Sequence, residues 1–124
     1  MRFIDTNILL YRISLLEVDA PKHQIAANIL SATDLRLSVQ VLQEFYVQAT
    51  CPSRGDPLKH EEAVGLIQTW KRFQPVSITA EIVDAALIGR ERWGIPYWDA
   101  AILEAARGAG CDIVLSEDLN HSHN

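Results

Sequence analysis

Four acidic side chains of this sequence lie within apolar runs or close to the end of one. They are Asp5, Glu44, Asp99 and Asp118. An isolated carboxylate is costly to bury unless a cation or a polar ligand compensates its charge, so several of them indicate a shared ligand. Carboxylate oxygens are hard ligands that suit Mg²⁺ or Mn²⁺. The sequence therefore predicts a divalent-metal site.

The elements that must position these acids alternate between short β-like runs and longer helical ones, which predicts an α/β domain. With 124 residues, we expect a single domain spanning residues 1–124. Strands joined through helices should be parallel and covered by helices on both faces. The predicted strands are 2–5, 35–38, 75–78 and 112–115, and the predicted helices are 6–16, 20–32, 39–50, 57–73, 79–93 and 97–108.

This architecture brings the acids to one edge of the sheet, because ligands of parallel sheets bind beyond the carboxyl ends of the strands. Asp5 and Asp118 end the first and last predicted strands, and the helix that carries Glu44 begins directly after the second. Glu44 and Asp99 each have apolar residues three or four positions away, which turns both acids inward. We expect Asp5, Glu44 and Asp99 to converge within reach of one cation.

Three of the acids also have ordinary structural explanations. Asp5 could cap the helix that begins at Thr6, Asp99 could be a first-turn helix acid, and Asp118 could form a turn. Glu44 has the weakest explanation of this kind. We favour a common site because four coincidences at the same end of one sheet are improbable.

Two other acids serve as internal controls for this geometry. Asp112 opens a strand at the opposite edge of the sheet, and Asp84 lies in the middle of a helix. Both are predicted to lie outside the site.

Composition limits the classes of function. The formal net charge of −5 argues against a protein that holds nucleic acid mainly through bulk positive charge. It leaves a nuclease open, because bound cations reverse the local sign where a phosphate sits. Each basic side chain that could contact a phosphate is more simply explained as a solvated surface charge; these side chains are Arg54, Lys59, Lys71, Arg72, Arg90 and Arg92.

The cysteines and the apolar stretches of the sequence indicate a cellular location. The two cysteines lie far apart and favour reduced thiols. No apolar stretch approaches the roughly 20 residues that span a bilayer, and Asp5 interrupts the place of a secretory signal. We expect a cytoplasmic protein without a membrane partner.

Four motifs, in this order and spacing, resemble those of the PIN-domain ribonucleases, and most closely the VapC toxins of VapBC toxin-antitoxin pairs. The resemblance covers essentially the whole chain and rests on Asp5-Thr6-Asn7, Leu42-Gln43-Glu44-Phe45, Tyr97-Trp98-Asp99-Ala100-Ala101 and Ser116-Glu117-Asp118-Leu119. It implies a Mg²⁺- or Mn²⁺-dependent endoribonuclease, a homodimer, inhibited by a cognate VapB-like antitoxin. It also implies that the acidic ligands are Asp5, Glu44, Asp99 and Asp118, with Thr6, Asn7 and Ser116 as polar neighbours.

The end of the sequence departs from that family. Its members continue beyond the last motif into a closing edge strand, whereas this sequence stops at Asn124. We therefore expect a PIN-like α/β fold with a central parallel sheet of about four strands that lacks the closing strand. His121 and His123 are expected in a frayed tail.

Other activities are disfavoured by single positions. A haloacid-dehalogenase-type phosphatase needs a second aspartate two residues after the first, where this sequence has Asn7. A receiver domain needs an aspartate after its third strand, where this sequence has Thr79. A glycine-rich phosphate loop and a Ser/His/Asp or Cys/His arrangement are absent from the sequence. The strongest rival is a catalytically idle PIN fold that acts as a protein-binding module.

The first predicted helix is apolar on nearly all sides over residues 8–16. One face against a sheet does not account for this, so a second apolar surface must cover the helix. The cover is either the helix over residues 21–31, a second copy of the protein, or an antitoxin helix.

Overall fold

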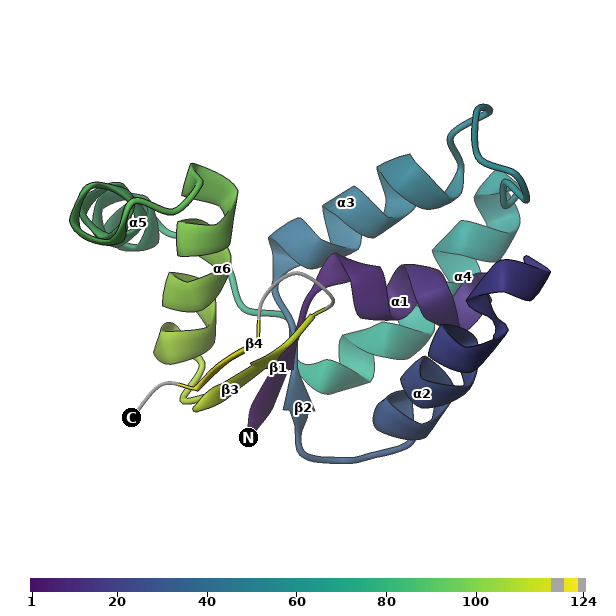
Figure 1. The fold of residues 1–124 in the computed structure, drawn as a ribbon, viewed down its shortest axis with the longest axis horizontal. Helices are drawn as coiled ribbons and strands as arrows, with labels where there is room; N and C mark the ends of the chain where they lie inside the picture. The colour runs from purple at the N-terminus through teal and green to yellow at the C-terminus, as the bar shows by residue number, and fades with distance from the viewer. Residues whose placement is uncertain (117–119, 123–124) are drawn as a thin grey trace.

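The computed structural model describes residues 1–116 and 120–122. Its centre is a four-stranded sheet in the order β2-β1-β3-β4 (Figure 1). Strand β1 pairs in parallel with β2 and β3, whereas β4 is antiparallel to β3. The bounds are β1 Arg2–Ile4, β2 Leu35–Arg36, β3 Ile113–Leu115 and β4 Asn120–Ser122.

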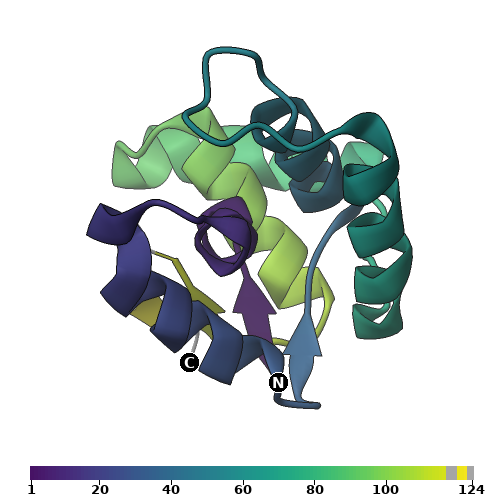
Figure 2. The same ribbon diagram turned by 90° about the vertical axis from the view of Figure 1, so that its right-hand side faces the viewer.

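Helices cover the sheet from both sides. In Figure 2, α1 and α2 stand in front of the sheet and α6 stands behind it, while α5 packs on α6. The α/β fold with helices on both faces of a parallel sheet is therefore confirmed. The bounds are α1 Thr6–Ile13, α2 Ala20–Leu30, α3 Val39–Ala49, α4 His60–Trp70, α5 Ala80–Trp93 and α6 Tyr97–Gly108, with the short 3₁₀ turns η1 Glu17–Asp19 and η2 Lys71–Phe73.

Polar caps set where several helices begin. Asp5 caps α1, the Ser38 hydroxyl accepts a hydrogen bond from the backbone of α3, and Thr79 does the same for α5. Helix α1 ends at Ile13, three residues earlier than predicted. The reason is Ser14, whose backbone is extended and whose hydroxyl donates to Asp19 over 2.7 Å.

Two segments differ from the sequence-based expectation. Residues 75–78 form an isolated parallel bridge between Val76 and Ser38 instead of a strand. Pro75 has no N–H to donate to a neighbouring strand, and the left-handed Gln74 (φ 52°) turns the chain just before it.

The second difference concerns the tail. Residues 120–122 were expected to fray, yet they form β4 and pair with β3, with Asn120 opposite Leu115. The exposed edge of β3 offers unpaired backbone groups that such a segment satisfies. The parallel part of the sheet therefore has three strands, β2, β1 and β3, and the tail adds an antiparallel strand at its edge, while His123 lies outside the described residues.

The core lies between the sheet and the helices on either side of it. Its fully buried large side chains come from β1, β2, α1, α3 and β3 and the segments beside them. They include Phe3, Ile4, Leu9, Leu35, Leu37, Val41, Phe45 and Val114. Among the described residues, no helix is long and apolar enough to cross a membrane.

Candidate active site

Asp5 stands directly beyond the carboxyl end of β1 and is the first residue of the candidate site. Its carboxylate accepts hydrogen bonds from the Thr6 backbone N–H (2.7 Å) and from the Ser116 hydroxyl (3.1 Å). The first bond is the helix cap that the sequence allowed for. The second joins the end of β1 to the end of β3, so Asp5 is held by two neighbouring strands.

Glu44 comes to the same place from the middle of α3. Its Oε2 accepts a hydrogen bond from the Thr6 hydroxyl (2.8 Å) and its Oε1 accepts one from the Gln40 side-chain amide (2.9 Å). Thr6 and Gln40 are both buried. Thr6 therefore links the two acids, because its backbone N–H binds Asp5 and its hydroxyl binds Glu44.

Asp99 completes the group from the first turn of α6. A negative side chain is favourable there because the helix amino terminus carries positive partial charge. Its proximity shows in the electrostatics of Asp5. Burial raises the pKa of Asp5, and the negative charges of Glu44 and Asp99 raise it further, while the hydrogen bonds from Thr6 and Ser116 act in the opposite direction.

The structure thus joins Asp5 and Glu44 through Thr6, with Ser116 as a second polar neighbour of Asp5, and places Asp99 close enough for its charge to raise the pKa of Asp5. Asn7 is partly exposed in the first turn of α1. Asp118 lies outside the described residues, so its predicted role stays a prediction. Gln40 was not among the predicted site residues. Its position four residues before Glu44 on one helix is the signal that could have identified it.

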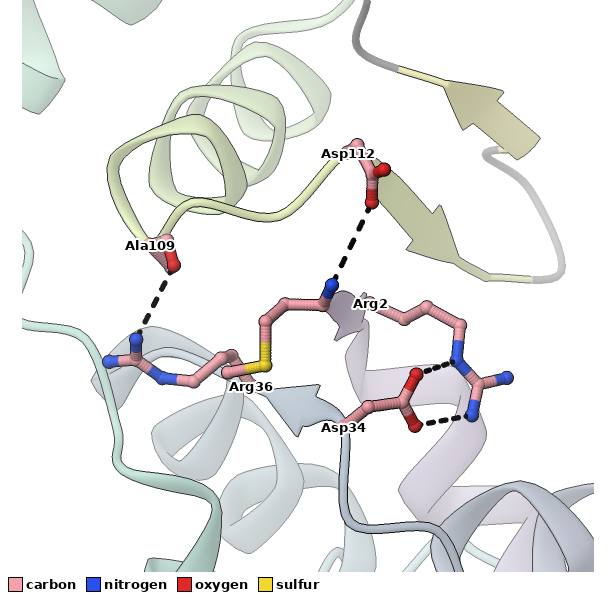
Figure 3. A network of polar contacts seen from close by, with 6 residues as sticks. Arg2, Asp34, Arg36, Ala109 and Asp112 are labelled. Carbon is pink, nitrogen blue, oxygen red and sulfur yellow. Dashed lines mark hydrogen bonds and ion pairs between the residues drawn. The ribbon is translucent and has the colours of Figure 1, made fainter.

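The two control acids lie elsewhere. Asp112 is at the amino end of β3, 3.9 Å from the Met1 amino group, in the polar network that also holds Arg2, Asp34 and Arg36 (Figure 3). Asp84 is exposed in the middle of α5. Neither acid contributes to the raised pKa of Asp5.

The donor set suits a hard divalent cation. Asp5, Glu44 and Asp99 supply only carboxylate oxygens, and their mutual repulsion favours a bound positive charge. Among residues 1–116 and 120–122, no three acidic, histidine or cysteine side chains are grouped closely enough to ligate one ion directly. Mg²⁺ needs few direct protein ligands because it keeps several waters, so the residues fit an ion held partly through water.

We expect Asp5→Asn to stabilise the protein at neutral pH. Because the folded-state pKa of Asp5 is raised, the folded protein binds more protons between the ordinary aspartate pKa of about 3.9 and the higher folded value. The free energy of unfolding therefore falls as pH rises through this window, and the stability lost in this way is still missing at pH 7. Asparagine carries no charge, yet it caps helices about as well as aspartate.

Urea unfolding at several pH values measures this effect. The advantage of Asp5→Asn should be present at pH 7 and shrink toward zero below the unfolded pKa of about 3.9, where the wild-type carboxyl is protonated in both states. An advantage independent of pH, or a loss of stability at pH 7, would contradict the description of Asp5.

Comparisons with known proteins identify a matching family and similar folds. The model of the PIN domain family matches residues 2–124. A solved toxin-antitoxin complex from Klebsiella pneumoniae is similar, with a TM-score of 0.71 and 19% identity over 94% of this chain and 85% of that one. The crystal structure of Mycobacterium tuberculosis VapC20, a Sarcin-Ricin loop cleaving toxin, has a TM-score of 0.71 and 17% identity, covering 95% of this chain and 92% of that one. No curated protein matches the sequence.

Proposed function

Because this chain belongs to the PIN-domain family, we propose that it is a divalent-metal-dependent endoribonuclease that hydrolyses RNA phosphodiesters. PIN domains generally use divalent metal ions. The observation that carries the proposal is the link that Thr6 makes between Asp5 and Glu44 at the carboxyl edge of the sheet. Burial raises the pKa of Asp5, and the charges of Glu44 and Asp99 raise it further.

The proposed ligands of the ion are Asp5, Glu44 and Asp99, directly or through water, with Asp118 as a fourth acid. When bound, Mg²⁺ or Mn²⁺ acidifies water for attack on a phosphodiester and neutralises negative charge on the phosphate. Asp5 and Glu44 are the acids whose positions the fold determines most firmly, since each accepts two hydrogen bonds. Those bonds keep the carboxylates oriented before substrate arrives.

Neighbouring side chains and backbone groups hold the site carboxylates in place. Thr6 binds both Asp5 and Glu44 and so fixes the position of one carboxylate relative to the other. Ser116 binds the second carboxylate oxygen of Asp5. Asp99 accepts no hydrogen bond from the described side chains, so its carboxylate is the freest of the three to adjust to a ligand. Such a reaction needs no side-chain nucleophile.

Metal should raise the melting temperature of the protein and be required for cleavage. An ion that binds only the folded state stabilises it in proportion to its concentration above Kd. We expect Mg²⁺ or Mn²⁺ to raise the melting temperature, EDTA to reverse the increase, and Asp99→Asn to lose much of it. The purified protein should cleave RNA with metal and not with EDTA.

The outcomes distinguish the proposal from its main rival. An idle PIN fold that binds proteins would leave RNA intact at every metal concentration. An unchanged metal response in Asp99→Asn would contradict the assignment of that acid as a ligand.

We also propose that the protein is the toxin of a toxin-antitoxin pair acting on cytoplasmic RNA. Support comes from the two similar structures, one of a toxin-antitoxin complex and one of a toxin that cleaves the Sarcin-Ricin loop. The proposed partner is a VapB-like antitoxin. Co-expression with the protein encoded immediately upstream should give a stable complex in which RNA cleavage is suppressed; separation of the two on purification would contradict this.

A homodimer is part of the same proposal. Helix α1 is already covered within the chain by α2 and α3. Exposed apolar side chains follow directly after α1, where Leu15 is 86% and Val18 83% exposed. Light scattering should report a dimer at micromolar concentration, and Leu15→Asp combined with Val18→Asp should convert it to a monomer. A monomeric wild-type protein would defeat this proposal.

A further inference from the structure

The three tryptophans of the chain have different environments. Trp70 is buried and meets the ring of Phe45 edge to face, with 4.8 Å between the ring centroids. Trp93 lies against its own helix, so close to Gly89 that a methyl group there would stand 3.0 Å from the ring. Trp98 is 62% exposed. Packing of the fold therefore explains the first two rings and leaves most of the third ring open.

Trp98 is the neighbour in sequence of one of the candidate site acids. It is the second residue of α6 and immediately precedes Asp99. The residues three, four and seven positions after it, Ala101, Ile102 and Ala105, are all buried. Helical side chains tilt toward the amino terminus of their helix, so the Trp98 side chain leans toward the end of α6 that carries Asp99.

We infer that Trp98 is the platform on which a base of the RNA stacks beside the scissile phosphate. This inference rests on the proposed function. An exposed indole offers a large flat apolar surface, and aromatic side chains bind nucleic-acid bases by stacking when those bases are unpaired. The Tyr97 ring meets the indole in a T-shaped arrangement with 5.2 Å between centroids, and Trp98 remains 62% exposed.

The negative net charge of the protein makes base stacking a useful source of affinity for RNA. A formal net charge of −5 provides little general attraction for the RNA backbone. Stacking does not depend on the release of counterions, so it supplies affinity that salt does not remove. It also selects for nucleotides outside a duplex, because a paired base cannot present its face to a side chain.

The test compares RNA binding by wild type, Trp98→Ala, Trp98→Phe and Trp93→Ala. The probes are a short fluorescein-labelled RNA of mixed sequence without self-complementarity and the same strand annealed to its complement. Anisotropy is measured with EDTA, so that the result does not depend on cleavage. Trp93→Ala is the matched control, because this ring is also exposed but packs on Gly89.

We expect Trp98→Ala to weaken binding of the unpaired strand on the order of 10-fold, at low and high salt alike. Trp98→Phe should recover most of this loss, while duplex binding and the melting temperatures of the two Trp98 variants stay unchanged. Wild-type affinity in Trp98→Ala, an equal loss in Trp93→Ala, or no recovery in Trp98→Phe would overturn the inference. Failure of the proposed function is a different result, namely binding of the unpaired strand without metal-dependent cleavage.

Discussion

Asp99→Asn protein should cleave RNA at least about 100-fold more slowly than wild type at saturating Mg²⁺. Loss of a residue that only orients a metal ligand already costs about 10- to 100-fold in metal affinity or activity, and loss of a ligand should cost more. The substitution keeps the size of the side chain and removes its charge. Asp99 accepts no hydrogen bond from the described side chains, so its loss should leave the fold intact. The cost therefore falls on metal affinity and turnover.

Asp84→Asn and Asp112→Asn are the matched controls for this experiment. Each removes one negative charge from the same protein, but Asp84 is exposed on α5 and Asp112 lies near the Met1 amino group at the opposite end of the sheet. Both should cleave RNA at the wild-type rate. Equal losses in all three variants would mean that net charge, and not a local site, determines activity. Higher Mg²⁺ should partly restore Asp99→Asn if weakened metal binding is the cause.

The positions of Asp5, Glu44 and Asp99 in their elements could be predicted because they depend on residues nearby in the sequence. An aspartate between an apolar strand and a helix caps that helix, and a parallel sheet places such residues at one edge. Asp5 follows this rule, and Asp99 follows the preference of helix amino ends for negative charge. Glu44 required the periodicity of its helix, in which apolar neighbours indicate an inward face.

The links between the acids could not be predicted in the same way. The hydrogen bond from Thr6 to Glu44 joins residues 38 positions apart and depends on how α1 packs on α3. The bond from Ser116 to Asp5 depends on which strands are neighbours in the sheet, across 111 positions. Only the bond from Gln40 to Glu44 lies within one helix, at the spacing of four residues that a sequence shows.

The two errors in the sheet have the same origin. The run Pro75-Val76-Ser77-Ile78 has the composition of a strand, yet it pairs at one residue because strand formation needs a partner along its length. The polar segment 120–122 lacks that composition, yet it pairs with the free edge of β3. Pairing opportunities in the folded protein outweighed the intrinsic preference of both segments.

A second large effect is expected in stability, for Phe45→Ala. Phe45 is fully buried and its ring meets Trp70 edge to face, so it fastens α3 to α4. Truncation of a buried phenylalanine costs about 3–5 kcal/mol, through lost burial and the cavity left behind. Urea unfolding should show a loss of this size, which is a large fraction of the roughly 5–15 kcal/mol that stabilises a typical domain.

Val47→Ala is the control on the same helix. Val47 is 66% exposed, so its truncation should change the free energy of unfolding by no more than about 0.5 kcal/mol. Because Phe45 directly follows Glu44, the comparison also tests how the core supports the site. If Phe45→Ala costs less than about 1 kcal/mol, the ring is not packed as described, since buried aromatic truncations cost more. A loss of about 3–5 kcal/mol would show that the helix that carries Glu44 is anchored in the core through the residue next to Glu44.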